Sequence, residues 1–192
     1  MALRITFGPG EWENTGLVYA YSWRFRELPR FRQEKDCIAN SAKQGDPGDY
    51  DYMGLMLPET YTAGAKIGIR CAFEEAAAPM LILSGENETD ENGILRTLEY
   101  YEIVIWKNGL NVWRHHTARR NTTHYKVLGA VFPLRQEEEH ILNMEVREKR
   151  LVMDVDGHRL DLFVHDLPDR FTLGYTACEG ICRLYEMTVQ NA

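Results

Sequence analysis

Aromatic, carboxylate, imidazole and amide side chains are concentrated in the segment 98–116, which reads LEYYEIVIWKNGLNVWRHH. The dipeptide Asn108-Gly109 divides this segment into two strand-like runs. Asn-Gly is typical of a two-residue hairpin turn, because both residues tolerate the positive φ that a type I′ turn requires. A two-residue loop fixes the register of the paired strands. The sequence therefore predicts a hairpin in which Glu102 lies opposite His115.

This register divides the hairpin into two faces, because directly opposed residues project to the same side of a sheet. One face is mostly aliphatic near the turn and should cover a core; it carries Ile103, Ile105, Leu110 and Val112, with Tyr101, Arg114 and His116 further out. The other face mixes aromatic rings with a carboxylate, an imidazole and an amide; it carries Tyr100, Glu102, Val104, Trp106, Asn111, Trp113 and His115.

Aromatic rings beside a few polar groups are what a sugar-binding site needs. Pyranose rings stack their flat C–H patches on aromatic side chains, and their hydroxyls need a few placed donors and acceptors. The basic run 114–120 could also hold an acidic sugar, such as a uronic acid, by bidentate pairing. The predicted ligand-binding residues are Tyr100, Trp106, Asn111, Trp113 and Arg114. In the alternative interpretation, Trp106 and Trp113 only pack across the sheet with Val104.

Glu102 and His115 are the candidate catalytic residues. In the predicted register they form a non-hydrogen-bonded pair with Cα atoms ~4.5 Å apart, so a charge-assisted contact could raise the pKa of the histidine. Glycoside hydrolysis needs a second carboxylate, and Glu99 is excluded because its odd spacing from Glu102 points it to the opposite face. The remaining candidates are Glu145, Asp161 and Glu179. Enzymatic activity therefore stays open at this point.

No metal site is predicted, since adjacent histidines on a strand, such as His115 and His116, point opposite ways and cannot chelate one ion. Two acidic loops, Gln44–Tyr52 and Gly85–Gly93, could hold a structural calcium ion or could simply be solvated turns. No other cofactor is expected.

Composition bounds the remaining possibilities. The chain has 192 residues, 44% hydrophobic and 27% charged, which is enough for one well-packed domain over residues 1–192. Its formal net charge of −7 disfavours nucleic acid as a partner, because phosphate binding needs the opposite sign. No apolar run approaches the ~18 residues of a membrane span. The start, MALRITFGPGEW, lacks an apolar signal core, so we expect a cytoplasmic or already trimmed protein whose four cysteines are reduced.

Strand patterns separated by turn-forming residues run along the whole chain. Asp156-Gly157 predicts a second two-residue hairpin turn. About a dozen short strands of this kind predict an all-β fold, a two-sheet antiparallel sandwich of the jelly-roll type.

The C-terminal half of the chain resembles bacterial members of the concanavalin A-like lectin/glucanase sandwiches. The shared pattern is strand, charged turn, strand, Asp-Gly, strand, a Pro-containing loop, a Gly-rich strand and a final strand with an aromatic residue. In this chain the pattern falls at Asp156-Gly157, Leu167-Pro168, Gly174-Tyr175 and Tyr185, and the segment 98–116 looks like the central concave-face hairpin. The resemblance implies a concanavalin A-like fold and a carbohydrate ligand. Retaining glucanases of that fold carry carboxylates two and four residues apart on one strand, whereas Glu102 is followed by Val104 and Trp106.

Two functional hypotheses follow. In the first, the chain is a carbohydrate-binding or carbohydrate-processing protein that holds an oligo- or polysaccharide on a concave sheet face. In the second, it is a non-catalytic structural or interaction domain, and the same aromatic face is covered by a partner or by a second copy in a homo-oligomer.

Overall fold

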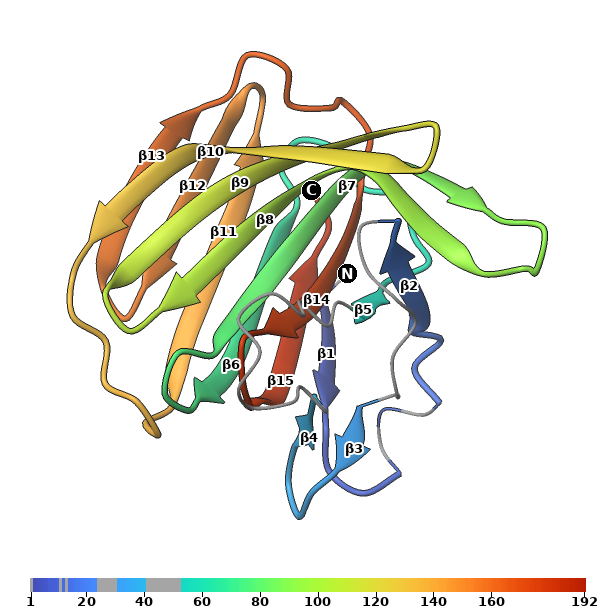
Figure 1. The fold of residues 1–192 in the computed structure, drawn as a ribbon. Coiled ribbons are helices and arrows are strands. Elements are labelled where there is room, and N and C mark those ends of the chain that lie inside the picture. Colours follow the sequence, from blue (N-terminus) through green and yellow to red (C-terminus); the bar gives the residue numbers. More distant parts are fainter. Residues whose placement is uncertain (1, 11, 13, 24–30, 41–52) are drawn as a thin grey trace.

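A computed structural model describes residues 2–10, 12, 14–23, 31–40 and 53–192. This part of the chain forms fifteen β-strands in two sheets that stack as the layers of a sandwich (Figure 1). The predicted all-β, two-sheet jelly-roll-like sandwich is confirmed. Within the described residues, no helix is long and apolar enough to span a bilayer.

The first sheet contains most of the C-terminal strands. Its order is β13 (His158–Phe163), β12 (Arg150–Val155), β11 (His140–Arg147), β6 (Lys66–Phe73), β15 (Cys182–Gln190), β4 (Ile38–Ala39) and β3 (Arg32–Gln33), with β1 (Ala2–Thr6) also paired to β15.

The second sheet contains the hairpin singled out by the sequence. Its order is β10 (Asn121–Val131), β9 (Gly109–Ala118), β8 (Leu95–Trp106), β2 (Val18–Ser22), β5 (Met53–Met56), β14 (Thr172–Cys178) and β7 (Ala78–Thr89), and β7 also pairs with β8. Around the hairpin, the strands therefore run β10-β9-β8-β7-β14, all antiparallel.

The hydrophobic core lies between the sheets. The aliphatic face of the hairpin covers it as predicted, because Ile103, Ile105, Leu110 and Val112 are fully buried there. In β11 the burial alternates strictly, as it does in a strand with one face toward a core and one toward solvent. By contrast, the first seven residues of β7 are all buried, so the outer face of the second sheet is also partly covered.

The turn between β8 and β9 differs from the predicted one. Lys107 and Asn108 form the turn, and Gly109 already pairs with Trp106. A type I′ turn requires a positive φ at both central residues. Asn108 does not have a positive φ, whereas Gly109 has a φ of 134°. The position needs glycine also because a Cβ there would collide with the carbonyl oxygen of Ala130 in β10. Each residue of β8 therefore pairs with a residue of β9 two positions away from the predicted partner. A shift by an even number leaves every side chain on its predicted face of the sheet.

At Asp156-Gly157 the prediction is confirmed. Both residues have positive φ, 51° and 89°, and the flanking residues Val155 and His158 pair directly. This is the geometry of a two-residue type I′ hairpin.

Candidate functional site

A hollow of about 410 Å³ opens on the outer face of the second sheet, over β7, β8, β9 and β10. Its floor is apolar and contains Ala78, Met80, Val104 and Cys178, which form a small buried cluster against Trp113. Polar and aromatic side chains surround this floor; they are Glu102, Trp106, Lys107, Asn111, Trp113, His115, His124, Lys126 and Glu179. The predicted polar face of the hairpin is thus the wall of a hollow rather than a flat surface.

Glu102 and His115 meet in this hollow, although they are not directly opposed. Glu102 pairs across the sheet with Trp113, and His115 pairs with Tyr100, so the two side chains approach each other diagonally. Their atoms Oε2 and Nε2 lie 2.8 Å apart, and the side chains are only 3% and 1% exposed. The predicted contact exists in a slightly different register.

Several polar atoms of this pair lack a hydrogen-bond partner in the described structure. They are Glu102 Oε1 and both ring nitrogens of His115; the short Nε2–Oε2 approach does not have hydrogen-bond geometry. A buried polar atom without a partner costs about 1–3 kcal/mol, so such atoms are rare in a folded chain unless something else supplies the partner. Both residues line the hollow, so a small shift of their side chains would bring these atoms into contact with a ligand or water.

The ring of Tyr100 supports the His115 side chain from behind. The two rings stack with centroids 4.5 Å apart and an angle of 7° between their planes. The Tyr100 hydroxyl donates a hydrogen bond to Ser22 Oγ at 2.9 Å, and the residue is 2% exposed. Tyr100 therefore lies beside His115 in the neighbouring strand and does not line the hollow. Its predicted role as a ligand contact remains a prediction.

The two tryptophans of the hairpin differ in their surroundings. Trp113 carries the Lys126 ammonium 5.1 Å from its ring centroid, and His124 is tilted against it at 5.7 Å. Trp106 is half-buried, and its Nε1 is a buried donor without a partner among the described residues. Trp106 is therefore the tryptophan better placed to meet an incoming molecule.

The structure does not bring Arg114 to the hollow. Arg114 projects to the opposite face of β9, where its guanidinium contacts Asp166, lies 3.6 Å from Glu99 and donates to the Tyr125 hydroxyl. Arg120, further along the same basic run, is 3.7 Å from Glu91. The acidic-sugar role expected for the run 114–120 therefore has no support from this hollow.

Of the three candidates for a second carboxylate, Glu179 shares the hollow with Glu102. Glu145 forms two hydrogen bonds with Arg147, and Asp161 forms one with Arg150; both pairs lie on the other sheet. These arginines also lower the pKa of Glu145 and Asp161 by hydrogen bonding to them. Both carboxylates are therefore engaged away from the site.

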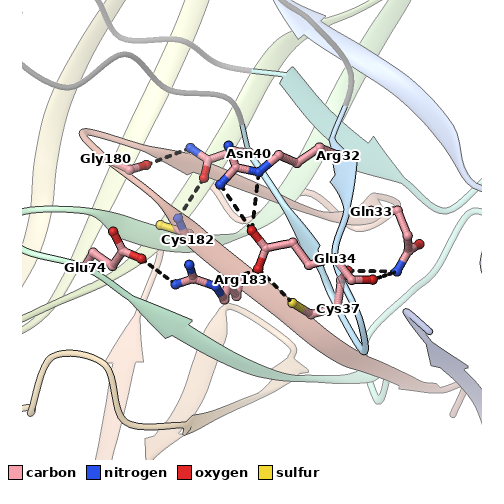
Figure 2. A network of polar contacts seen from close by, with 9 residues as sticks. All are labelled: Arg32, Gln33, Glu34, Cys37, Asn40, Glu74, Gly180, Cys182 and Arg183. Carbon is pink, nitrogen blue, oxygen red and sulfur yellow. Dashed lines mark hydrogen bonds and ion pairs between the residues drawn. The ribbon is translucent and has the colours of Figure 1, made fainter. Parts of the chain in front are cut away.

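The turn that carries Glu179 is fastened from inside the protein by Asn40 (Figure 2). The Asn40 side chain donates to the Gly180 carbonyl at 2.8 Å and accepts from the Cys182 amide at 2.7 Å, and it is 5% exposed. The turn needs this support because Glu179 and Gly180 both have positive φ, 59° and 141°. One wall of the hollow thus depends on a buried side chain that is distant in sequence.

Arg183 extends the same network just beyond the turn (Figure 2). Its guanidinium lies 2.6 Å from Glu74 and 2.8 Å from Glu34. Burial lowers the pKa of Arg183, but the hydrogen bonds and charges of the two glutamates outweigh it and raise that pKa above its ordinary value. Burial likewise opposes ionisation of Glu34, but Arg183 and Arg32 bring its pKa below its ordinary value.

The acidic loops give no calcium site that can be described. The segment predicted as the loop Gly85–Gly93 is strand up to Thr89, the last residue of β7, and only its end is a turn. In that turn Asp90 accepts hydrogen bonds from the amides of Asn92 and Ile94 and from the Arg96 side chain. The predicted loop Gln44–Tyr52 lies outside the described residues. Within the described ranges, no three His, Cys, Asp or Glu side chains cluster as metal ligands would.

Sequence reasoning missed His124 and Lys126. Both lie on β10, which pairs with β9 through a turn at Arg119 and Arg120. These arginines have positive φ, 52° and 62°, where the usual turn signal would be Asn or Gly. The residue types at the turn therefore did not predict this hairpin.

No protein-family model matches the sequence, and no curated protein matches it. Solved structures do match the fold. A carbohydrate-binding module (CBM66) from Bacillus subtilis has a TM-score of 0.62 at 7% identity, covering 89% of this chain and 92% of that one. A family 16 glycoside hydrolase, an endo-glucanase from Bacteroides ovatus, has a TM-score of 0.57 at 11% identity, covering 98% and 94%.

A Bacillus subtilis protein of unknown function with a galectin-like fold has a TM-score of 0.61 at 11% identity, covering 98% of this chain and 94% of that one. At these identities the likeness shows the fold alone. The chain therefore has the two-sheet jelly-roll-like β-sandwich that the sequence resemblance implied.

Proposed function

We propose that the chain binds a glycan in the hollow over β7 to β10. The observation that carries this proposal is the set of buried polar atoms without partners, Glu102 Oε1, Trp106 Nε1 and the ring nitrogens of His115, beside an open space with an indole wall. Sugar hydroxyls are both donors and acceptors, so a single ring can satisfy carboxylate, imidazole and indole groups together.

Each side chain has a distinct role in this proposal. Trp106 stacks against the C–H face of a pyranose, as aromatic side chains do in apolar sites with a few polar groups. Glu102 Oε1 accepts a hydrogen bond from a ligand hydroxyl, and Asn111 and His115 fix the orientation of the ring. Because the protein groups are already held by neighbouring strands, the binding costs little ordering of the protein.

The fold supports the same proposal as an analogy. Two of the similar solved structures are named as a carbohydrate-binding module and a glycoside hydrolase. A shared fold does not fix function, so the weight of the proposal rests on the hollow itself.

Isothermal titration calorimetry with a panel of plant and bacterial oligosaccharides tests the proposal. We expect one or more sugars to bind the wild-type chain, and Trp106→Ala to weaken that binding about tenfold or more, as truncation of a central aromatic anchor does. Phe163→Ala is the matched control, since this aromatic residue is 59% exposed on β13 of the other sheet. Binding that responds equally to both variants, or no binding by any sugar, contradicts the proposal.

Glycoside hydrolysis is a second candidate, favoured by the presence of Glu179 in the same hollow as Glu102. Hydrolysis uses one carboxylic acid to protonate the leaving oxygen and one carboxylate as nucleophile or base. If the chain cleaves the sugar that it binds, Glu102→Gln and Glu179→Gln should each abolish the release of reducing ends and leave binding intact. Release that persists in both variants excludes this pair.

Self-association is the competing explanation for an aromatic face. Sedimentation velocity of the chain without sugar separates the two. A dimer that is dissociated by Trp106→Ala and that binds no oligosaccharide would favour the interface hypothesis.

A further inference from the structure

The charges around the hollow are unevenly distributed. Lys107, in the turn between β8 and β9, and Lys126, on β10, both line it. Neither lysine forms an ion pair with any described residue, whereas arginines elsewhere on the sheets, such as Arg147 and Arg150, are paired with carboxylates. The carboxylates in the lining are Glu102, which contacts His115, and Glu179, on the β14–β15 turn.

Lys126 is exposed to solvent, and its ammonium lies at the edge of the hollow. Its ammonium lies over the ring of Trp113, at 5.1 Å from the centroid. Lys126 is directly opposite Trp113, and Trp113 is directly opposite Glu102, so the three residues form one row across β10, β9 and β8. Two strand spacings, about 10 Å, separate the backbone of the lysine from that of the glutamate. That span is comparable with the width of one substituted sugar ring.

The chain has a net charge of −7 and therefore more carboxylates than basic groups. Two lysines without an ion pair among the described residues are unusual in such a chain. An acidic protein surface repels anions in general, whereas a hollow with low-dielectric walls concentrates the field of the charges that line it. The part of the hollow next to each lysine therefore favours an anionic group of the ligand. Glu179 follows β14 and is separated from β10 by β9, β8 and β7, so it disfavours the same group at the β14 side of the hollow.

We infer that the sugar bound in this hollow carries anionic substituents, carboxylates or sulfates: one lies against Lys126 while a hydroxyl of the same or the adjacent ring lies on Glu102, and another, on a further ring, lies against Lys107 at the turn end of the hollow. This inference rests on the proposed glycan binding and adds the chemical class of the ligand. It also places the anion-binding groups on β10 and the β8–β9 turn, and not on the basic run after Arg114.

Three matched oligosaccharides test the inference by calorimetry: a neutral galactan oligomer, a galacturonate oligomer with carboxylates, and a sulfated galactan oligomer. We expect an anionic oligomer to bind more tightly than the neutral one, and its affinity to fall when NaCl is raised from about 50 mM to about 500 mM. The carboxylated and sulfated arms identify which anion is preferred.

Variants locate the effect. Lys126→Ala and Lys107→Ala should each weaken binding of the anionic oligomer about three- to fivefold, as loss of a partly exposed charge pair does, and should weaken binding of the neutral oligomer less. Lys66→Ala is the control, because Lys66 is an exposed lysine on the outer face of the other sheet and has no ion pair among the described residues.

The outcomes separate the two proposals. If the neutral and anionic oligomers bind equally, or Lys126→Ala weakens them no more than Lys66→Ala, the inference fails while glycan binding stands. If none of the oligomers binds, and a wider sugar panel is also negative, both proposals fail.

Discussion

Replacing the buried pair Glu102–His115 with apolar residues should stabilise the fold while it abolishes ligand binding. The perturbation is the double variant Glu102→Leu/His115→Phe, which keeps approximate side-chain shapes and a ring that can still stack on Tyr100. Three atoms of the pair are buried and have no hydrogen-bond partner among the residues that the structure describes. A binding site retains such groups for function, at a cost in stability.

The magnitude follows from these atoms. Each unpartnered buried polar atom costs about 1–3 kcal/mol, and the contact between the two side chains offsets part of the total. Replacement of a buried ion pair by apolar residues is typically neutral or stabilising by about 1–4 kcal/mol. For a chain of this size, 1 kcal/mol corresponds to about 2–4 °C in melting temperature. We therefore expect the double variant to melt several degrees higher than the wild type.

Urea denaturation provides the measurement. We expect the double variant to unfold at a higher urea concentration, with the same dependence of the unfolding free energy on urea concentration as the wild type. The single variants are the internal controls. His115→Phe alone leaves a buried carboxylate without its partner and should destabilise the chain by about 3–5 kcal/mol. A double variant less stable than the wild type by more than about 1 kcal/mol would refute the reasoning, because the pair would then contribute to folding by itself.

Three further predictions concern the elements that build the site. Asn40→Ala removes two buried hydrogen bonds from the turn that carries Glu179, and should lower the free energy of unfolding by about 2–4 kcal/mol; urea denaturation checks this value, and an unchanged midpoint contradicts it. Gly109→Ala places a methyl group against the Ala130 carbonyl at a positive φ, and should destabilise the chain by more than about 1 kcal/mol, read as a drop in melting temperature. The pKa of Glu34 is below its ordinary 4.5 when the chain is folded, so its pairing with Arg183 stabilises the fold above that pH and loses this effect as the pH falls further. Urea midpoints measured on either side of pH 4.5 should show a smaller acid loss for Glu34→Gln than for the wild type, and equal losses would exclude this contribution.

The two faces of the central hairpin could be predicted from sequence, because side chains alternate between the faces along each strand whatever the exact pairing. The turn type was wrong: Asn108 does not adopt a positive φ, and the paired strands shift by two residues. An even shift exchanges opposed partners without moving any side chain to the other face. For this reason Glu102 and His115 still meet, even though neither faces its predicted partner directly.

The rest of the hollow could not be predicted, because it depends on the order of strands that are distant in sequence. Glu179 reaches the hollow only because β14 lies beside β7, and no local pattern around residue 179 indicates that neighbour. Lys126 and His124 depend on the unusual turn at residues 119–120. The fastening of the Glu179 turn by Asn40 spans about 140 residues of chain and has no signature in either segment.

The indole N–H signals of the chain offer the most direct test of the central claim that the hollow binds a glycan. The sequence contains four tryptophans, at positions 12, 23, 106 and 113, so a ¹⁵N-labelled sample gives four resolvable indole cross-peaks. Titration with the oligosaccharide that binds in calorimetry should move the Trp106 and Trp113 peaks with a common saturation curve and leave Trp12 and Trp23 in place. Movement confined to Trp12 or Trp23, or no movement at saturating sugar, would contradict the account.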